Sequence, residues 1–282
     1  MYDRDVSDVR PSAVAGTWYP GTRAGLVQAV DAHLASAAAG GAPGCPRAII
    51  APHAGLMYSG PVAAHAYALV RQCRYSAVVL VGPSHFAGFH GVSIWPRGAW
   101  DTPCGEVAVA TELAAAMMAA SPDILEHPAA HGREHSLEMQ LPFVAHLLPG
   151  VPIVPLVMGY QSRETAFALG DALARAIESH TATHADVLLV ASSDLSHYED
   201  AATAARLDAV VLGYVEALDA TGLMEALDRE PRHACGGGPI VSVLHAARQR
   251  GATRAQMLRY ADSGDVSGDK SSVVGYMAAA IW

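Results

Sequence analysis

Three short apolar stretches, each followed at once by a turn that carries a histidine, constrain the possible fold most strongly. Continuous aliphatic and β-branched runs separated by helical segments are typical of a mainly parallel sheet buried on both faces. Ligands of such sheets bind beyond the carboxyl ends of the strands, so the three turns are predicted to lie at one edge. The three strand and turn pairs are Ala48–Ala51 with His53, Ala77–Val81 with His85, and Val187–Val190 with Asp194 and His197.

The rest of the chain predicts one α/β domain with a mainly parallel or mixed central sheet and helices on both faces. Hydrophobic residues make up 51% of the chain and charged residues 16%, which is enough apolar material to cover both faces of a sheet. No linker marks a boundary, so residues 1–282 are expected to form a single domain. Further strands are predicted over Val151–Val157, Ala255–Tyr260 and Val273–Ile281, and helices over Gly25–Ala38, Val62–Arg71, Thr111–Ala120, Glu134–Leu147, Glu164–Ser179, Ala201–Leu218 and Pro239–Arg250, with a loop over Gly40–Pro46.

Charge and cysteine usage narrow the class of partner and compartment. A formal net charge of −9 opposes attraction to nucleic acid or to anionic membrane surfaces. Met1–Asp5 is charged where a signal peptide is apolar, and no stretch reaches the roughly 18 apolar residues of a spanning helix. We therefore expect a soluble cytoplasmic protein with no nucleic-acid or membrane partner. A disulfide framework is not expected, because the four cysteines (Cys45, Cys73, Cys104 and Cys235) lie far apart without a paired spacing.

His53 and His85 are the first candidates for metal ligands. A neutral imidazole suits iron, copper, zinc or nickel, and a strand end holds it on a rigid scaffold. The two histidines are about one βαβ unit apart, which brings two neighbouring strand ends together. The alternative is that each imidazole caps a turn through a hydrogen bond.

Cys235 and the third histidine turn supply further candidates. Cys235 precedes Gly236–Pro239 and an expected helix, whose positive end would lower the pKa of the thiol and favour a metal-binding thiolate. The alternative is a small buried thiol beside a tight glycine turn. Asp194 is a candidate for orienting a ligand or for binding the metal itself, and His197 for a general acid or base.

The segment His131–His135 fits the H-x-x-E-H pattern of inverted zinc peptidases. That pattern needs both histidines on one helix face, whereas Pro128 and Gly132 favour a helix start near Glu134. The match is therefore interpreted as accidental. The residues predicted to face the pocket without binding the metal are Glu134, His135 and Glu138, together with Ser84 from the second histidine turn.

Several segments together resemble the Memo family. They follow one another over nearly the whole chain, which makes the resemblance specific. The family is similar in fold to the class III extradiol dioxygenases, which are non-haem iron enzymes that cleave aromatic rings. Bacterial members are described beside AMMECR1-like and radical SAM proteins, which implies a functional link to such proteins. The matching segments are Ala15–Pro20, Ala51–Gly55 with Tyr58–Gly60, Gly82–His85, Glu134–Pro142, Ser192–His197, and Cys235–Gly236 with Pro239–Ile240.

The resemblance implies a ligand set and a proton carrier. His53 and His85 would be two ligands of one metal ion and Cys235 the third, while His197 would match the dioxygenases' base with Asp194 beside it. The third ligand of the dioxygenases is a carboxylate, and a thiolate prefers softer ions. Iron(II) and copper are therefore the expected metals, and zinc is a further candidate.

Three functions compete at this stage. The leading interpretation is a metal-dependent redox protein or oxygenase-like enzyme of unknown substrate, in which His197 moves protons. The second is a non-catalytic adaptor that recognises a small molecule or a peptide in the same cleft. The third is a zinc hydrolase that uses His131, Glu134 and His135.

Overall fold

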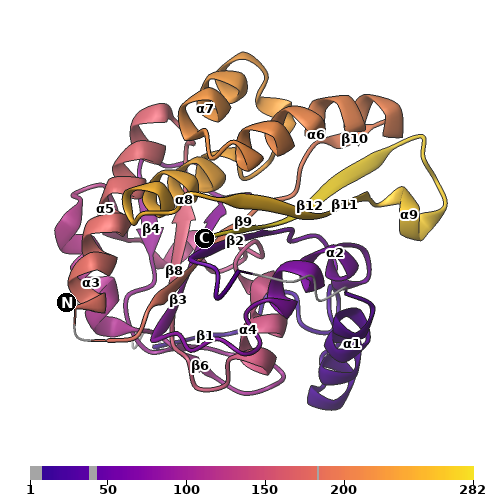
Figure 1. Ribbon diagram of the computed structural model, residues 1–282. Coiled ribbons are helices and arrows are strands. Elements are labelled where there is room, and N and C mark those ends of the chain that lie inside the picture. Colours follow the sequence, from indigo (N-terminus) through magenta and orange to yellow (C-terminus); the bar gives the residue numbers. More distant parts are fainter. Residues whose placement is uncertain (1–7, 38–42, 183) are drawn as a thin grey trace.

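A nine-stranded mixed sheet runs through the centre of the protein, with helices on both faces (Figure 1). The computed structural model describes residues 8–37, 43–182 and 184–282. The strand order is β10-β12-β2-β9-β3-β8-β4-β7, and β11 pairs with β12. The strands of this sheet are β2 (Ala48–Ala51), β3 (Ala77–Pro83), β4 (Val92–Ile94), β7 (Ile124–Glu126), β8 (Ile153–Met158), β9 (Val187–Ser192), β10 (His197–Glu199), β11 (Ala255–Asp262) and β12 (Val273–Ile281).

The centre of the sheet is parallel and its flanks are antiparallel. Strands β2, β9, β3 and β8 pair in parallel, whereas β12 runs antiparallel to β2 and β4 antiparallel to β8. Every residue of β2, β3, β8 and β9 is buried, as expected for strands covered on both faces. The predicted α/β fold with a mixed sheet is confirmed, and the three predicted histidine turns follow the neighbouring strands β2, β9 and β3.

Helices cover the two faces in separate layers. Helices α1, α2 and α4 lie on one face, while α3, α5 and α8 pack together on the other (Figure 1). In the described part of the chain, none of the helices has the length and apolar character needed to cross a membrane. The helices are α1 (Arg23–Ser36), α2 (Leu56–Ala68), α3 (Thr111–Ala120), α4 (Leu141–Leu147), α5 (Arg163–Thr181), α6 (Ala201–Glu216), α7 (Ala220–Arg229), α8 (Gly237–Gln249) and α9 (Gly264–Ser267).

Long elements match their predicted positions better than short ones. Strands β2 and β12 and helix α3 have the predicted bounds, whereas helix α7 and the two- and three-residue strands lacked a sequence pattern long enough to show them. Three of those short strands form a separate small sheet: β1 (Val9–Arg10), β5 (Ala99–Trp100) and β6 (Val107–Ala108). Met1–Asp5 and the first part of the predicted loop Gly40–Pro46 lie outside the described residues.

The predicted helix over Glu134–Leu147 begins later than expected. Residues 134–137 are not helical, a 3₁₀ turn spans Glu138–Gln140, and α4 starts at Leu141. The Glu134 carboxylate accepts the two backbone N–H groups that follow it, which favours a compact turn over a helix. Proline in the first turn of α4 then suits a helix start at that point.

The structure pairs Cys45 with Cys73 in a disulfide, which corrects the expectation drawn from cysteine spacing. Cys45 lies just before β2 and Cys73 just after α2. A helix that follows a strand returns along it, so its end lies beside the strand's beginning. The spacing along the chain does not reveal this proximity.

Candidate metal centre

The histidine turns meet at the carboxyl edge of the sheet. His53 lies two residues beyond β2, His85 two residues beyond β3, and Asp194 two residues beyond β9. Because β9 lies between β2 and β3, the three turns are side by side. His53 is 1% exposed, whereas the His85 side chain is 27% exposed, so the group is closed on one side and open on the other.

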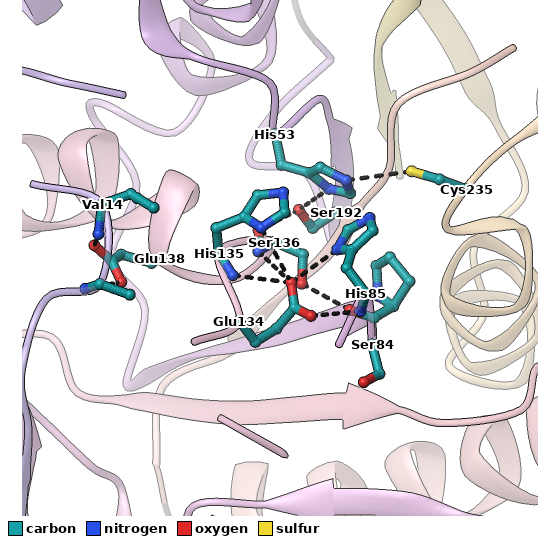
Figure 2. Close-up of polar contacts among 12 residues, drawn as sticks. Val14, His53, Ser84, His85, Glu134, His135, Ser136, Glu138, Ser192 and Cys235 are labelled. Atoms are coloured by element: carbon teal, nitrogen blue, oxygen red, sulfur yellow. Dashed lines mark hydrogen bonds and ion pairs between the residues drawn. The ribbon is translucent and has the colours of Figure 1, made fainter. Parts of the chain in front are cut away.

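Three imidazoles form a group that could hold a metal ion. The ligand atoms of His53, His85 and His135 all lie within 4.8 Å of one another. The rings of His85 and His135 stack with centroids 4.5 Å apart, and His53 meets His85 edge-on at 5.2 Å. Figure 2 shows the three rings converging from different segments of the chain. Such a set of neutral nitrogen donors suits a first-row transition metal.

Glu134 fixes the orientation of His85. Its carboxylate accepts the His85 backbone N–H at 2.6 Å and His85 Nδ1 at 2.9 Å, in addition to the N–H groups of His135 and Ser136 (Figure 2). Burial would raise the pKa of Glu134, but these hydrogen bonds and the charge of His85 hold it at about 2. An ionised carboxylate accepts only, so Nδ1 of His85 carries a hydrogen, and in the neutral ring Nε2 has the lone pair that could bind a metal.

A chain of buried hydrogen bonds sets the orientation of Gln140. Its Nε2 lies 3.1 Å from the Pro52 carbonyl oxygen, which can only accept. Its Oε1 therefore faces the Tyr67 hydroxyl, which donates over 2.9 Å. The side chain of Gln140 is completely buried, so no water competes for these bonds. The second hydrogen of Nε2 remains for Ser192, whose Oγ is 2.8 Å away.

The same series of hydrogen bonds also fixes the tautomer of His53. The Ser192 hydroxyl donates its one hydrogen to the Ser136 carbonyl at 2.6 Å and accepts from Gln140. Its other lone pair faces His53 Nδ1 at 2.9 Å, so Nδ1 must carry a hydrogen. Nε2 of His53 is left with a lone pair, which points toward Cys235 and the other two imidazoles (Figure 2). His53 and His85 thus present the same nitrogen to the centre of the cluster for independent reasons.

Burial keeps two of the imidazoles neutral. It lowers the pKa of His53 to about 3, with the charge of His85 acting in the same direction. It lowers the pKa of His135 to about 4, to which the charges of His53 and His85 also contribute. Neutral imidazoles bind metals, whereas protonated ones do not, so these two side chains are ready to bind at neutral pH.

Cys235 lies beside the cluster, but its thiol differs from the expectation. Its Sγ is 3.2 Å from His53 Nε2, and α8 begins two residues later. Burial raises the pKa of Cys235 well above its usual range, and the charge of Asp194 raises it further. The predicted lowering by the helix end is therefore wrong for the metal-free protein, because burial outweighs the dipole. A bound cation would reverse that balance and favour the thiolate.

Asp194 and His197 occupy the third turn. Asp194 Oδ1 accepts the backbone N–H groups of His53 at 2.7 Å and Ala54 at 3.3 Å, and burial raises the pKa of this carboxyl group. These two hydrogen bonds hold the His53 turn in place. Nδ1 of His197 lies 2.8 Å from the Leu195 carbonyl, so it donates there and Nε2 keeps the lone pair.

The structure places Glu138 and Ser84 away from the imidazoles. Glu138 is fully buried and accepts hydrogen bonds from Arg10 at 2.7 Å and from the Tyr19 hydroxyl at 2.7 Å. Figure 2 shows it apart from the histidines and beside Val14, whose N–H it also accepts. Glu138 thus anchors the N-terminal segment. The Ser84 hydroxyl donates to the carbonyl of Ala87 in its own turn at 2.8 Å.

That anchored segment delivers an aromatic residue that sequence reasoning did not single out. The ring of Trp18 lies 4.3 Å from the His135 ring and is 40% exposed. Phe86, which follows His85, is 55% exposed and its ring lies 6.0 Å from that of His135. Both aromatic side chains border the open side of the cluster. An alternating or helical pattern could not reveal them, because both lie in irregular segments.

His131 lies outside the imidazole group. It is fully buried between Trp95 and Trp100, with ring centroids 5.9 and 5.8 Å away, and its Nε2 lies 2.9 Å from Ser93 Oγ. Residues 131–135 do not form one helix, so the H-x-x-E-H geometry is absent from this described segment. His135, which the sequence placed in the pocket, is the member of this segment that joins the cluster.

Comparison with known proteins assigns a family. The model of the Memo-like protein family matches residues 10–280. A MEMO1 family protein of Methanothermobacter thermautotrophicus is 42% identical over 231 residues, covering 82% of each chain. A MEMO1 family protein of Thermotoga maritima is 36% identical over 97% of this chain and 99% of its own. An uncharacterized protein, JW3007 from Escherichia coli K12, has a similar fold, with a TM-score of 0.54, 16% identity, and coverage of 82% of this chain and 98% of its own.

Proposed function

Because the chain belongs to the Memo-like protein family, we propose that it is a metal-dependent redox protein with one metal ion at the carboxyl edge of its sheet. His53 and His85 would each bind through Nε2, and His135 or Cys235 would supply the third ligand. The observation that carries this proposal is the double constraint on Nδ1: Ser192 accepts from one ring and Glu134 from the other. Metal-binding histidines typically donate their other ring N–H to an oxygen acceptor in this way.

The third ligand decides which metal fits best. Three neutral imidazoles suit iron, copper, nickel or zinc, whereas a thiolate in place of His135 favours copper or zinc over iron(II). A bound iron or copper ion would supply one-electron chemistry and polarise a substrate at its open positions. Iron(II) and copper are the metals that serve the proposed redox role, while zinc would restrict the site to Lewis-acid chemistry.

The protein's own residues would position the substrate and move protons. The open side of the cluster lies at His85, where Trp18 and Phe86 would pack against a bound molecule and limit access of water. Asp194 is buried and burial raises its pKa, so it would take up and return a proton beside the His53 turn more readily than an exposed carboxylate. His197, with its Nε2 lone pair, would accept or return a proton at the rim.

Metal content of single variants tests the proposal. Wild-type protein, purified without oxygen and reconstituted with iron or copper, should hold about one equivalent, and His53→Ala and His85→Ala should hold almost none. Comparing His135→Ala with Cys235→Ser identifies the third ligand, since only loss of the true ligand removes the metal. His146→Ala is a matched control because this histidine pairs with Asp31 on the surface. A wild type that stays metal-free after reconstitution would contradict the proposal.

One observation favours a second function, a binding module that uses the same cleft without turnover. Trp18 and Phe86 expose apolar rings at the mouth, and the Arg133 guanidinium lies 5.0 Å from the Phe86 ring. Exposed aromatic side chains beside a cation suit recognition of a small molecule or a peptide. If Trp18→Ala abolishes ligand binding while His53→Ala leaves it intact, the binding module would replace the redox protein. The expected link to AMMECR1-like and radical SAM proteins stays a prediction.

A further inference from the structure

A cavity of about 650 Å³ lies at the other edge of the sheet. Its lining includes Arg47, which immediately precedes β2, and Asp186, which immediately precedes β9, together with Arg175 of α5 and Arg250, which follows α8. Because β2 and β9 are parallel, their amino ends lie opposite the carboxyl ends that carry the histidines. The volume falls in the range of small-molecule sites, roughly 300–1,000 Å³. This arginine cavity is therefore a site separate from the metal centre.

The arginine cavity has an excess of positive charge in an acidic protein. Its lining holds three arginines against two carboxylates, Asp186 and Glu178, although the chain as a whole has a formal charge of −9. One carboxylate serves two of the guanidinium groups. Asp186 accepts from Arg250 Nη2, and its other oxygen is 3.7 Å from Arg47 Nη1. The local field therefore favours an anion.

Arg250 provides a second observation that is independent of the charge count. Its side chain is only 7% exposed, and its Nη1 is shielded from water without a hydrogen-bond partner among the described residues. Buried guanidinium nitrogens are normally paired, so an unpaired one calls for a partner such as an ion or water. Burial lowers the pKa of Arg250, Asp186 opposes that effect, and the charge of Arg47 reinforces it.

We propose that the arginine cavity binds a phosphate group, free or as the ester of a small molecule, between Arg47 and Arg250. Planar guanidinium groups match phosphate oxygens in paired hydrogen bonds, which a single shared carboxylate cannot fully supply. Arg175 of α5 also lines the cavity, and one of its nitrogens donates to the Ala120 carbonyl at 2.9 Å. The volume leaves room for an organic part beyond the phosphate. A nucleic acid is disfavoured by the net negative charge of the chain.

Calorimetric titration with defined probes tests the proposal on the full chain. The probes are inorganic phosphate, glycerol 3-phosphate and citrate, each at an ionic strength matched with chloride. We expect both phosphate compounds to bind and citrate to bind at least tenfold more weakly. Tighter binding of glycerol 3-phosphate identifies an ester as the ligand, and equal binding identifies free phosphate. Binding of citrate without either phosphate compound would overturn the proposal.

Variants locate the bound phosphate. Arg250→Gln should raise the dissociation constant for phosphate at least tenfold. Because Arg250 is buried and its loss could disturb folding, the double variant Arg47→Gln/Arg175→Gln changes the more exposed arginines instead and should have a similar effect. Arg229→Gln removes one positive charge, as Arg250→Gln does, at an exposed position of α7 outside the cavity, and should bind phosphate as the wild type does. Equal affinities for phosphate in the double variant and in Arg229→Gln would overturn the proposal.

Discussion

At the carboxyl edge of the sheet, neighbours hold two of the imidazoles in one orientation, whereas at the amino edge a buried guanidinium nitrogen has no hydrogen-bond partner among the described residues. His53 and His85 each donate through Nδ1 and keep one lone pair for the centre of the cluster. Arg250 shares Asp186 with Arg47, and its Nη1 stays unpaired within the described part of the chain. The comparison indicates that the proposed metal site needs lone pairs in set directions, while the proposed anion site keeps a donor unused.

Glu134→Gln should produce the largest change at the carboxyl edge. An amide oxygen cannot replace a carboxylate that accepts four N–H groups, and the new amide nitrogen would face one of those donors. We expect the free energy of unfolding to fall by about 4 kcal/mol, because at least two buried N–H donors would each lose an acceptor at about 1–3 kcal/mol. Denaturant unfolding measures it. Glu126→Gln, which changes a surface carboxylate paired with Arg97, should cost under about 1 kcal/mol. Equal losses would show that Glu134 does not organise the cluster.

Removal of the disulfide should disturb the amino edge alone. Cys45 and Cys73 close a loop with a sequence separation of 28 residues, for which chain entropy predicts a contribution of about 3.6 kcal/mol. Cys45→Ser should lower the free energy of unfolding by that amount and leave metal content unchanged. Cys104→Ser is the control, because Cys104 is free. If both variants unfold at the same denaturant concentration, the bond does not stabilise the protein in solution.

Acid should lower the free energy of unfolding of the metal-free protein because two buried histidines of the carboxyl edge stay neutral in the folded state. Burial holds the pKa of His53 at about 3 and of His135 at about 4, below the 6.5 of the unfolded chain. The unfolded state therefore binds protons first, so stability is complete above pH 6.5 and falls as pH drops toward these lower values. Each histidine adds up to about 1.4 kcal/mol per pH unit.

Denaturant unfolding at pH 6 and at pH 5 measures how steeply the free energy of unfolding changes with pH. His135→Asn should reduce this slope by the contribution of about one proton, whereas Arg47→Gln, from the amino edge, should leave the slope unchanged. Glu134, with its pKa held at about 2, adds to the loss only below about pH 4.5. A slope that His135→Asn leaves intact would mean that this imidazole is protonated in the folded state as it is in the unfolded state.

The strand ends and turns at the carboxyl edge could be predicted from the sequence because they depend on local patterns. The apolar runs that became β2, β3 and β9 are continuous, and each is followed within two residues by a polar turn. Strand order then places His53, His85 and Asp194 together without further information. Local patterns of this kind locate strand ends, and parallel topology aligns them.

Contacts between distant segments account for what the sequence did not show. His135 reaches the cluster because Glu134 bonds the backbone of His85, 49 residues away, and not because a helix begins there. The helix end near Cys235 was visible, but the burial and the Asp194 carboxylate that raise the pKa of its thiol were not. The arginines of the amino edge come from separate elements and form no motif. Such features depend on packing, which single-sequence patterns do not encode.

Ser192→Ala should have the smallest effect and probes the carboxyl edge most selectively. The substitution removes the acceptor that holds a hydrogen on His53 Nδ1, so the ring can turn its lone pair away from the metal. We expect metal affinity to fall about tenfold, the lower end for loss of a ligand's hydrogen-bond partner. Ser242→Ala is the control, since that buried hydroxyl donates to backbone oxygens within the α5–α8 packing and should leave affinity unchanged. An unchanged affinity in Ser192→Ala would mean that the cluster does not depend on this tautomer, and the contrast between the two edges would then rest on His85 and Glu134 alone.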